Sequence, residues 1–179
     1  MVTTKSISNE LGITGIFNEA ILKRFEQNLG NQDSLLVLVS DAFKSADMYL
    51  KNNEQNDLSV LILAGGWIET LHFATQLANS TDNDDIKNRI GEQKITIKNL
   101  INLMLPYNEN QQVATIVNQL NELKDIYGEI GFSYEFKEPE TDAESKINSI
   151  KSISKVDMTD EHLSLITEQV ESIRNSIIN

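Results

Sequence analysis

The chain has 179 residues, of which 40% are hydrophobic and 23% are charged. This is the composition of a folded globular domain, and it excludes a disordered chain. The net charge of −12 argues against nucleic acid as a partner, because binding to phosphates depends on Lys and Arg, and only 15 of these face 27 acidic residues.

No cysteine is present, which excludes disulfides, thiolate nucleophiles and metal sites built from cysteine. The N-terminal stretch MVTTKSISNELGITG lacks the apolar core of a signal peptide. No apolar run approaches the roughly 18 residues that span a bilayer. We therefore expect no transmembrane segment in the chain as given, and its oligomeric state stays open.

Hydrophobic residues recur at spacings of three and four along most of the chain, which predicts amphipathic helices. Residues 1–15, before the first of them, are expected to form a loose tail. The predicted helices cover residues 17–29, 33–51, 57–79, 84–105, 109–127 and 159–178.

The helical pattern stops between residues 131 and 158. The stretch GFSYEF, residues 131–136, alternates aromatic with polar residues and predicts a short strand. INSIKSISKV, residues 147–156, is either a second strand paired with the first or an irregular segment. The insert over 131–158 is therefore a small β-like hairpin or irregular.

Together these elements predict an all-α fold, an up-down antiparallel helical bundle of about five to six helices with this insert before the last helix. Neighbouring helices are expected to be antiparallel because their connections are short. We expect a single helical domain over residues 1–179.

The most apolar predicted helix contains LILAGGWIETLHFATQLA, residues 61–78. Gly65 and Gly66 each cost roughly 1 kcal/mol relative to alanine in a helix interior. We expect a neighbouring helix to pack into the notch that they leave, and a kink beside a ligand site is the alternative. The chain has no GxGxxG and no GxxxxGK[ST] sequence, so a phosphate-binding role is not supported.

Trp67 is the only tryptophan, and it follows these glycines directly. A tryptophan side chain buries about 150–250 Å², so we expect Trp67 in the core with a hydrogen-bond partner for its indole N–H. If it were exposed beside two glycines, it would instead indicate a binding surface.

Glu69 and His72 lie on one helical face, at the Glu-x-x-His spacing of ferritin-like di-iron bundles. Such bundles need a second motif, but the other histidine, His162, has Thr159 three positions before it. A single metal site built from Glu69, His72 and a distant carboxylate stays open. The alternative is that the two side chains hydrogen-bond each other or the indole.

No catalytic residues, metal ligands or cofactor are predicted from the remaining motifs. STDNDDIKN, residues 80–88, has Ile86 and Lys87 where a calcium loop needs an acidic or amide residue and a glycine. No GxSxG motif exists, which leaves nucleophilic catalysis without support. Because 27 acidic residues permit many pairs, an enzyme that uses two carboxylates is a minor alternative.

Three stretches of the chain together carry a family resemblance: RFEQNLGNQDSLLVLVSDAFKSADMYL, LILAGGWIETLHFATQLA and RIGEQKITIKNLINLMLPYN. Over residues 17–127, and in the last helix TDEHLSLITEQVESIRNSII, the chain resembles an uncharacterised family of all-helical, exported, lipoprotein-like proteins of Gram-negative bacteria. The resemblance implies a location in the cell envelope or periplasm, with a leader and a lipidated cysteine removed. Without it, a cytoplasmic location is expected.

These observations predict a non-enzymatic helical bundle of the cell envelope that binds another envelope protein or has a structural role. The alternative is a bundle that binds a small molecule or a metal at a core site near Glu69 and His72. The residues of that alternative site are Gly65, Gly66, Trp67, Glu69 and His72.

Overall fold

The computed structural model describes residues 6, 19–81, 83–142, 146–150 and 152–178. The tail predicted over 1–15 therefore lies, apart from residue 6, outside the described residues. The chain divides into two compact units, Met1–Val60 and Leu61–Asn179, and each is described by itself. The single domain expected over the whole chain stays a prediction.

The first unit contains α2 (Glu19–Gln27), α3 (Gln32–Asn52) and the first turn of α4 (Asn56–Thr81). Asn31 caps the N-terminus of α3, and its side chain accepts the backbone N–H of Ser34 at 3.0 Å. Asp47 of α3 accepts from Lys51 at 2.7 Å and from the hydroxyl of Ser59 at 2.6 Å. These two donors lower the pKa of Asp47, and the contact with Ser59 joins α3 to the start of α4.

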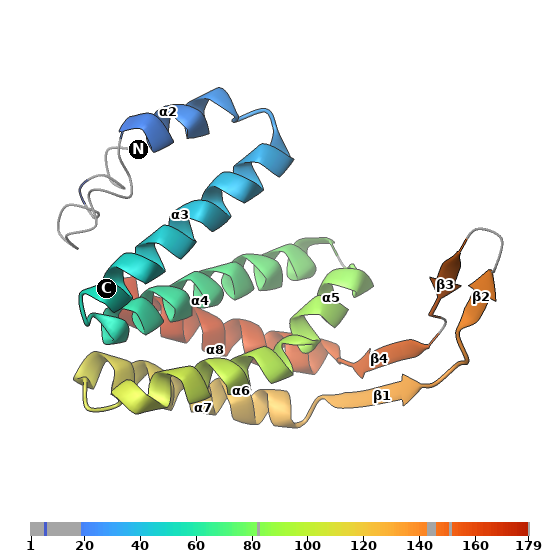
Figure 1. Ribbon diagram of the computed structural model, residues 1–179. Helices are drawn as coiled ribbons and strands as arrows, with labels where there is room; N and C mark the ends of the chain where they lie inside the picture. Colours follow the sequence, from blue (N-terminus) through green and yellow to red (C-terminus); the bar gives the residue numbers. More distant parts are fainter. Residues whose placement is uncertain (1–5, 7–18, 82, 143–145, 151, 179) are drawn as a thin grey trace. The chain divides into compact units, whose positions relative to one another are not determined.

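The second unit is a helical bundle (Figure 1). It contains the rest of α4, then α5 (Asp84–Gly91), α6 (Gln93–Met104), the short 3₁₀ turn η1 (Leu105–Tyr107), α7 (Gln111–Gly128) and α8 (Asp160–Ile178). The helix α7 packs against both α6 and α8, which run antiparallel to it. The prediction of an all-α bundle is confirmed. The largest side chains that are completely buried in this unit include Ile97, Met104, Leu120, Leu123, Tyr127, Ile166 and Ile173.

The helix predicted over 84–105 is divided at Glu92 into α5 and α6. At the division, the carbonyl of Ile90 accepts the hydroxyl of the buried Tyr127 at 3.1 Å. Gly91 is also buried, and a Cβ atom built on it would lie 2.5 Å from Cγ1 of Val156. The chain therefore has a glycine where a neighbouring strand lies directly against the helix backbone.

The insert between α7 and α8 contains paired strands. Of the two predicted forms, a β-like hairpin or an irregular segment, it therefore has the β-like one. In the ribbon, defined as β1 (Gly131–Glu135) and β4 (Ile153–Asp157), the strands pair antiparallel with Phe132 opposite Val156. Beyond the ribbon, β2 (Glu140–Asp142) pairs with β3 (Ile147–Ser149). Figure 1 shows the ribbon extending away from the end of the bundle formed by α7 and α8.

Among the described residues, α4 is the one helix whose length and apolar composition would allow it to cross a membrane. One such helix is weak evidence for a membrane span. The core helix of a water-soluble protein passes the same test, although only 28% of the apolar window of α4 is buried here. Length and composition therefore define no clear transmembrane segment.

Candidate functional site

The site predicted on 61–78 is divided between different sides of α4. Trp67 meets Gln93 at the start of α6, whereas Glu69 meets Arg174 of α8. Successive residues of a helix are about 100° apart, so Trp67 and Glu69 project in very different directions. The five predicted residues consequently do not surround one ligand.

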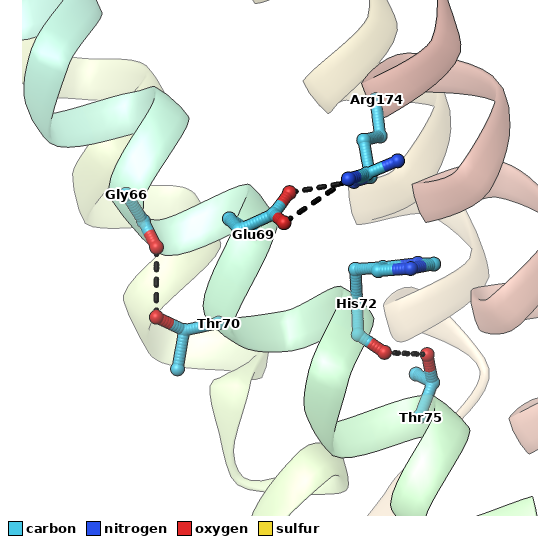
Figure 2. Close-up of polar contacts among 6 residues, drawn as sticks. All are labelled: Gly66, Glu69, Thr70, His72, Thr75 and Arg174. Atoms are coloured by element: carbon cyan, nitrogen blue, oxygen red, sulfur yellow. Dashed lines mark hydrogen bonds and ion pairs between the residues drawn. The ribbon is translucent and has the colours of Figure 1, made fainter. Parts of the chain in front are cut away.

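Glu69 forms a bidentate ion pair with Arg174 (Figure 2). The guanidinium Nε donates to Oε2 at 2.6 Å, and Nη2 donates to Oε1 at 3.2 Å. These hydrogen bonds lower the pKa of the Glu69 carboxyl and raise the pKa of Arg174, because they favour both charged forms.

His72 lies on the same side of α4 as Glu69, one turn further along the helix (Figure 2). Its Nδ1 atom is buried and has no hydrogen-bond partner among the described residues. The expectation that Glu69 and His72 bond each other or the indole is wrong, because the partners are Arg174 for Glu69 and Gln93 for Trp67.

A metal site is not favoured by these contacts. Arg174 occupies both oxygens of the carboxylate that such a site would use. Within the part of the chain that the structure describes, no three His, Asp or Glu residues are grouped so that they could hold a metal ion.

The two glycines do not form the predicted packing notch within the second unit. No atom of the described residues of that unit lies within 4 Å of a Cβ built on Gly65 or Gly66. The helix also continues through both positions, and the carbonyl of Gly66 accepts the hydroxyl of Thr70 at 2.8 Å (Figure 2). Neither packing nor a break in the helix therefore explains the glycines here.

Trp67 is half-buried rather than fully buried, and it forms one wall of a pocket of about 330 Å³. Its indole N–H donates to Oε1 of Gln93 at 3.2 Å. The pocket lies between α4 and α5, and sequence reasoning identified only Trp67 among its residues. The other apolar residues of its walls are Leu71 and Ala74 from α4 and Ile86 and Ile90 from α5.

A sequence signal for this pocket exists, although its two halves are separated along the chain. Trp67, Thr70, Leu71 and Ala74 have the spacing of one helical face, and so do Ile86, Arg89, Ile90 and Gln93. Each set by itself is the pattern of an ordinary core-facing helix. Only their juxtaposition in the fold shows that the two faces leave a space between them.

The second candidate site is the aromatic face, defined as Phe132, Tyr134 and Phe136. Phe132 and Tyr134 share one side of β1 because alternate residues of a strand point the same way, and Phe136 follows at the same spacing. The three side chains are 47%, 64% and 67% exposed. Sequence reasoning used this alternation to predict the strand but not to predict a site.

The aromatic face is anchored to the bundle at its base. The ammonium group of Lys94 lies 5.5 Å from the centre of the Phe132 ring. The same ammonium donates to the carbonyls of Gly128 and Ile130 at the end of α7, at 3.1 and 2.7 Å. The start of the ribbon is thus held against α6 and α7, while Tyr134 and Phe136 lie further out.

Comparison with known proteins finds no matching family model, no matching curated protein and no matching solved structure. The pocket and the aromatic face are therefore the features of this chain that indicate a function.

Proposed function

We propose that this protein is a non-enzymatic helical bundle that binds another protein through the aromatic face of its ribbon. The observation that carries the proposal is the exposure of Tyr134 and Phe136, 64% and 67%, on a two-stranded ribbon that leaves the bundle. Exposed apolar surface of this kind marks interaction sites, and aromatic residues are enriched at the centres of protein interfaces.

The ribbon also offers main-chain hydrogen-bonding groups. Among the described residues, β1 pairs with β4 alone, so each of these strands has one outer edge. An extended segment of a partner can add to such an edge and gain both main-chain hydrogen bonds and contacts with the rings. A two-stranded ribbon is marginally stable in water by itself, and a third strand would stabilise it.

Contacts between the base of the ribbon and the bundle favour binding, because they restrict the base and so limit the entropy lost on docking. Val156 lies against Gly91 of α5, and Phe132 lies beside Lys94. The far end of the aromatic face therefore extends from a base that contacts the bundle.

Charge favours a basic partner over a second copy of this chain. Each copy carries a net charge of −12, so two copies repel each other while a basic surface is attracted. The family resemblance described above suggests a partner in the cell envelope, and fractionation of cells that produce the natural protein tests that location.

Site-directed photocrosslinking in such cells tests the proposal. Tyr134→p-benzoylphenylalanine is expected to give a discrete adduct with a second protein, because position 134 is 64% exposed on the aromatic face. The matched control is Asn118→p-benzoylphenylalanine, at an exposed position of α7. Equal adducts from both positions, no adduct from position 134, or an adduct with twice the mass of the chain would contradict the proposal.

A second variant links the adduct to the aromatic face itself. With the crosslinker at position 132, on the same face as Tyr134, the chain without other changes should give the same adduct, and Tyr134→Ser with Phe136→Ser should reduce its yield on the order of tenfold. Both side chains are more than half exposed, so the substitutions should leave the helical circular dichroism of the bundle unchanged.

A further inference from the structure

We infer that the pocket beside Trp67 is a binding site for a small, uncharged, apolar molecule. The inference is independent of the proposed docking of a protein, because the pocket is lined by residues between Trp67 and Gln93 and includes no residue of the ribbon. The two sites can therefore be tested separately.

The size of the pocket defines the size of its ligand. A volume of about 330 Å³ lies at the lower end of the range, roughly 300–1,000 Å³, of pockets that bind small molecules. It suits a molecule of one to three rings, or a short acyl chain, better than a nucleotide or a haem. Ala74 and Thr70 contribute to the space because their side chains are short.

The polar groups inside the pocket are already satisfied by one another. The indole N–H of Trp67 donates to Oε1 of Gln93 at 3.2 Å, and Nε2 of Gln93 donates to the carbonyl of Arg89 at 3.2 Å. The walls otherwise consist of the apolar side chains of Leu71, Ile86 and other residues of α4 and α5. A ligand that needs hydrogen bonds would disrupt this arrangement, whereas an apolar ligand leaves it intact.

The charges at the pocket also select against an ionic ligand. Arg89 and Asp85, which line the pocket, are exposed and have opposite signs. Arg89 is further neutralised by Glu92, whose Oε2 accepts from Nη1 at 2.8 Å. Neither an anion nor a cation therefore gains a strong net attraction, and the flat face of Trp67 favours apolar or aromatic contacts.

Titration with N-phenyl-1-naphthylamine, an uncharged fluorescent probe, tests the inference on the full chain. Trp67 is the only tryptophan, so its emission detects a bound probe without a label, and the variants below assign the binding to this pocket. We expect saturable binding at one site, with quenching of the Trp67 emission. Absence of saturable binding up to the solubility limit of the probe would contradict the inference.

Substitutions that fill the pocket identify the site. Ala74→Leu should weaken probe binding on the order of tenfold, because the new side chain occupies the same space. The matched control is Ala20→Leu, at an exposed position of α2 in the other unit, which should bind as the wild type does. Thr70→Leu provides a second filled variant if Ala74→Leu does not fold.

Two further comparisons distinguish this site from the alternatives. Tyr134→Ser with Phe136→Ser should bind the probe normally, and a loss of binding there would assign the signal to the aromatic face. The anionic probe 1-anilinonaphthalene-8-sulfonate should bind more weakly than the uncharged one. Tighter binding of the anion would mean that Arg89 selects a charged ligand, which contradicts the inference.

Discussion

Arg174 and Glu69, which are 105 residues apart in the chain, form a bidentate ion pair that joins α8 to α4. The planar guanidinium matches both oxygens of the carboxylate, which gives the contact a defined direction as well as attraction. The pair also engages both oxygens of the carboxylate in the Glu-x-x-His sequence, and a metal ion would have to displace Arg174 to bind them.

Removal of this arginine should change the titration of Glu69. We expect Arg174→Gln to raise the pKa of Glu69 toward its ordinary value of 4.5, because the donor that stabilises the carboxylate is lost. Carbon-detected NMR of the side-chain carboxyl measures this directly. The pKa of Asp47, which Lys51 and Ser59 lower, should stay unchanged and serves as an internal control.

The sign of the accompanying effect on stability follows from the same shift. A carboxyl whose pKa is lowered by folding contributes stability above its unfolded pKa, here about 4.5, and loses it as the pH falls through the folded pKa. Arg174→Gln should therefore lower Tm at neutral pH and have a much smaller effect in acid. A Tm difference that is equal at both pH values would show that the pair does not contribute through its charge.

Gly91 and Val156 should be energetically coupled, because a Cβ on Gly91 would lie 2.5 Å from Cγ1 of Val156. Gly91→Ala is expected to cost about 1–3 kcal/mol through overpacking, partly offset by up to about 1 kcal/mol of helix propensity. Val156→Ala removes the clash. Urea unfolding of both single variants and the double variant should give a coupling of about 0.5–3 kcal/mol, and additive effects would contradict the predicted close approach.

Gly66→Ala should stabilise the protein, since nothing in the second unit lies within 4 Å of the added methyl group and the residue is inside α4. The expected gain is about 0.5–1 kcal/mol, because alanine loses less conformational entropy than glycine in a helix. Urea unfolding with unchanged m-value measures it. A loss of stability would instead support the sequence-based prediction that a neighbouring helix packs against Gly66.

Much of the bundle follows from the spacing of its apolar residues. Leu163, Ile166, Val170 and Ile173 of the last predicted helix are all buried, because a helix that packs on one side needs apolar residues every three or four positions. The same spacing rule does not predict that the helix expected over 84–105 is divided at Glu92 into α5 and α6. The apolar spacing continues across it, although a strand about 65 residues further along the chain lies against Gly91 at this point.

The sequence by itself determined the helical class, the strand at 131–136 and the shared face of Glu69 and His72, because each depends on residues that are near one another in the chain. Only the tertiary structure decided that Arg174 forms an ion pair with the Glu69 carboxylate and that Trp67 lines a pocket between α4 and α5. Those outcomes depend on which helix packs on which face. Many helix pairs present similar apolar stripes, so spacing alone does not choose among them.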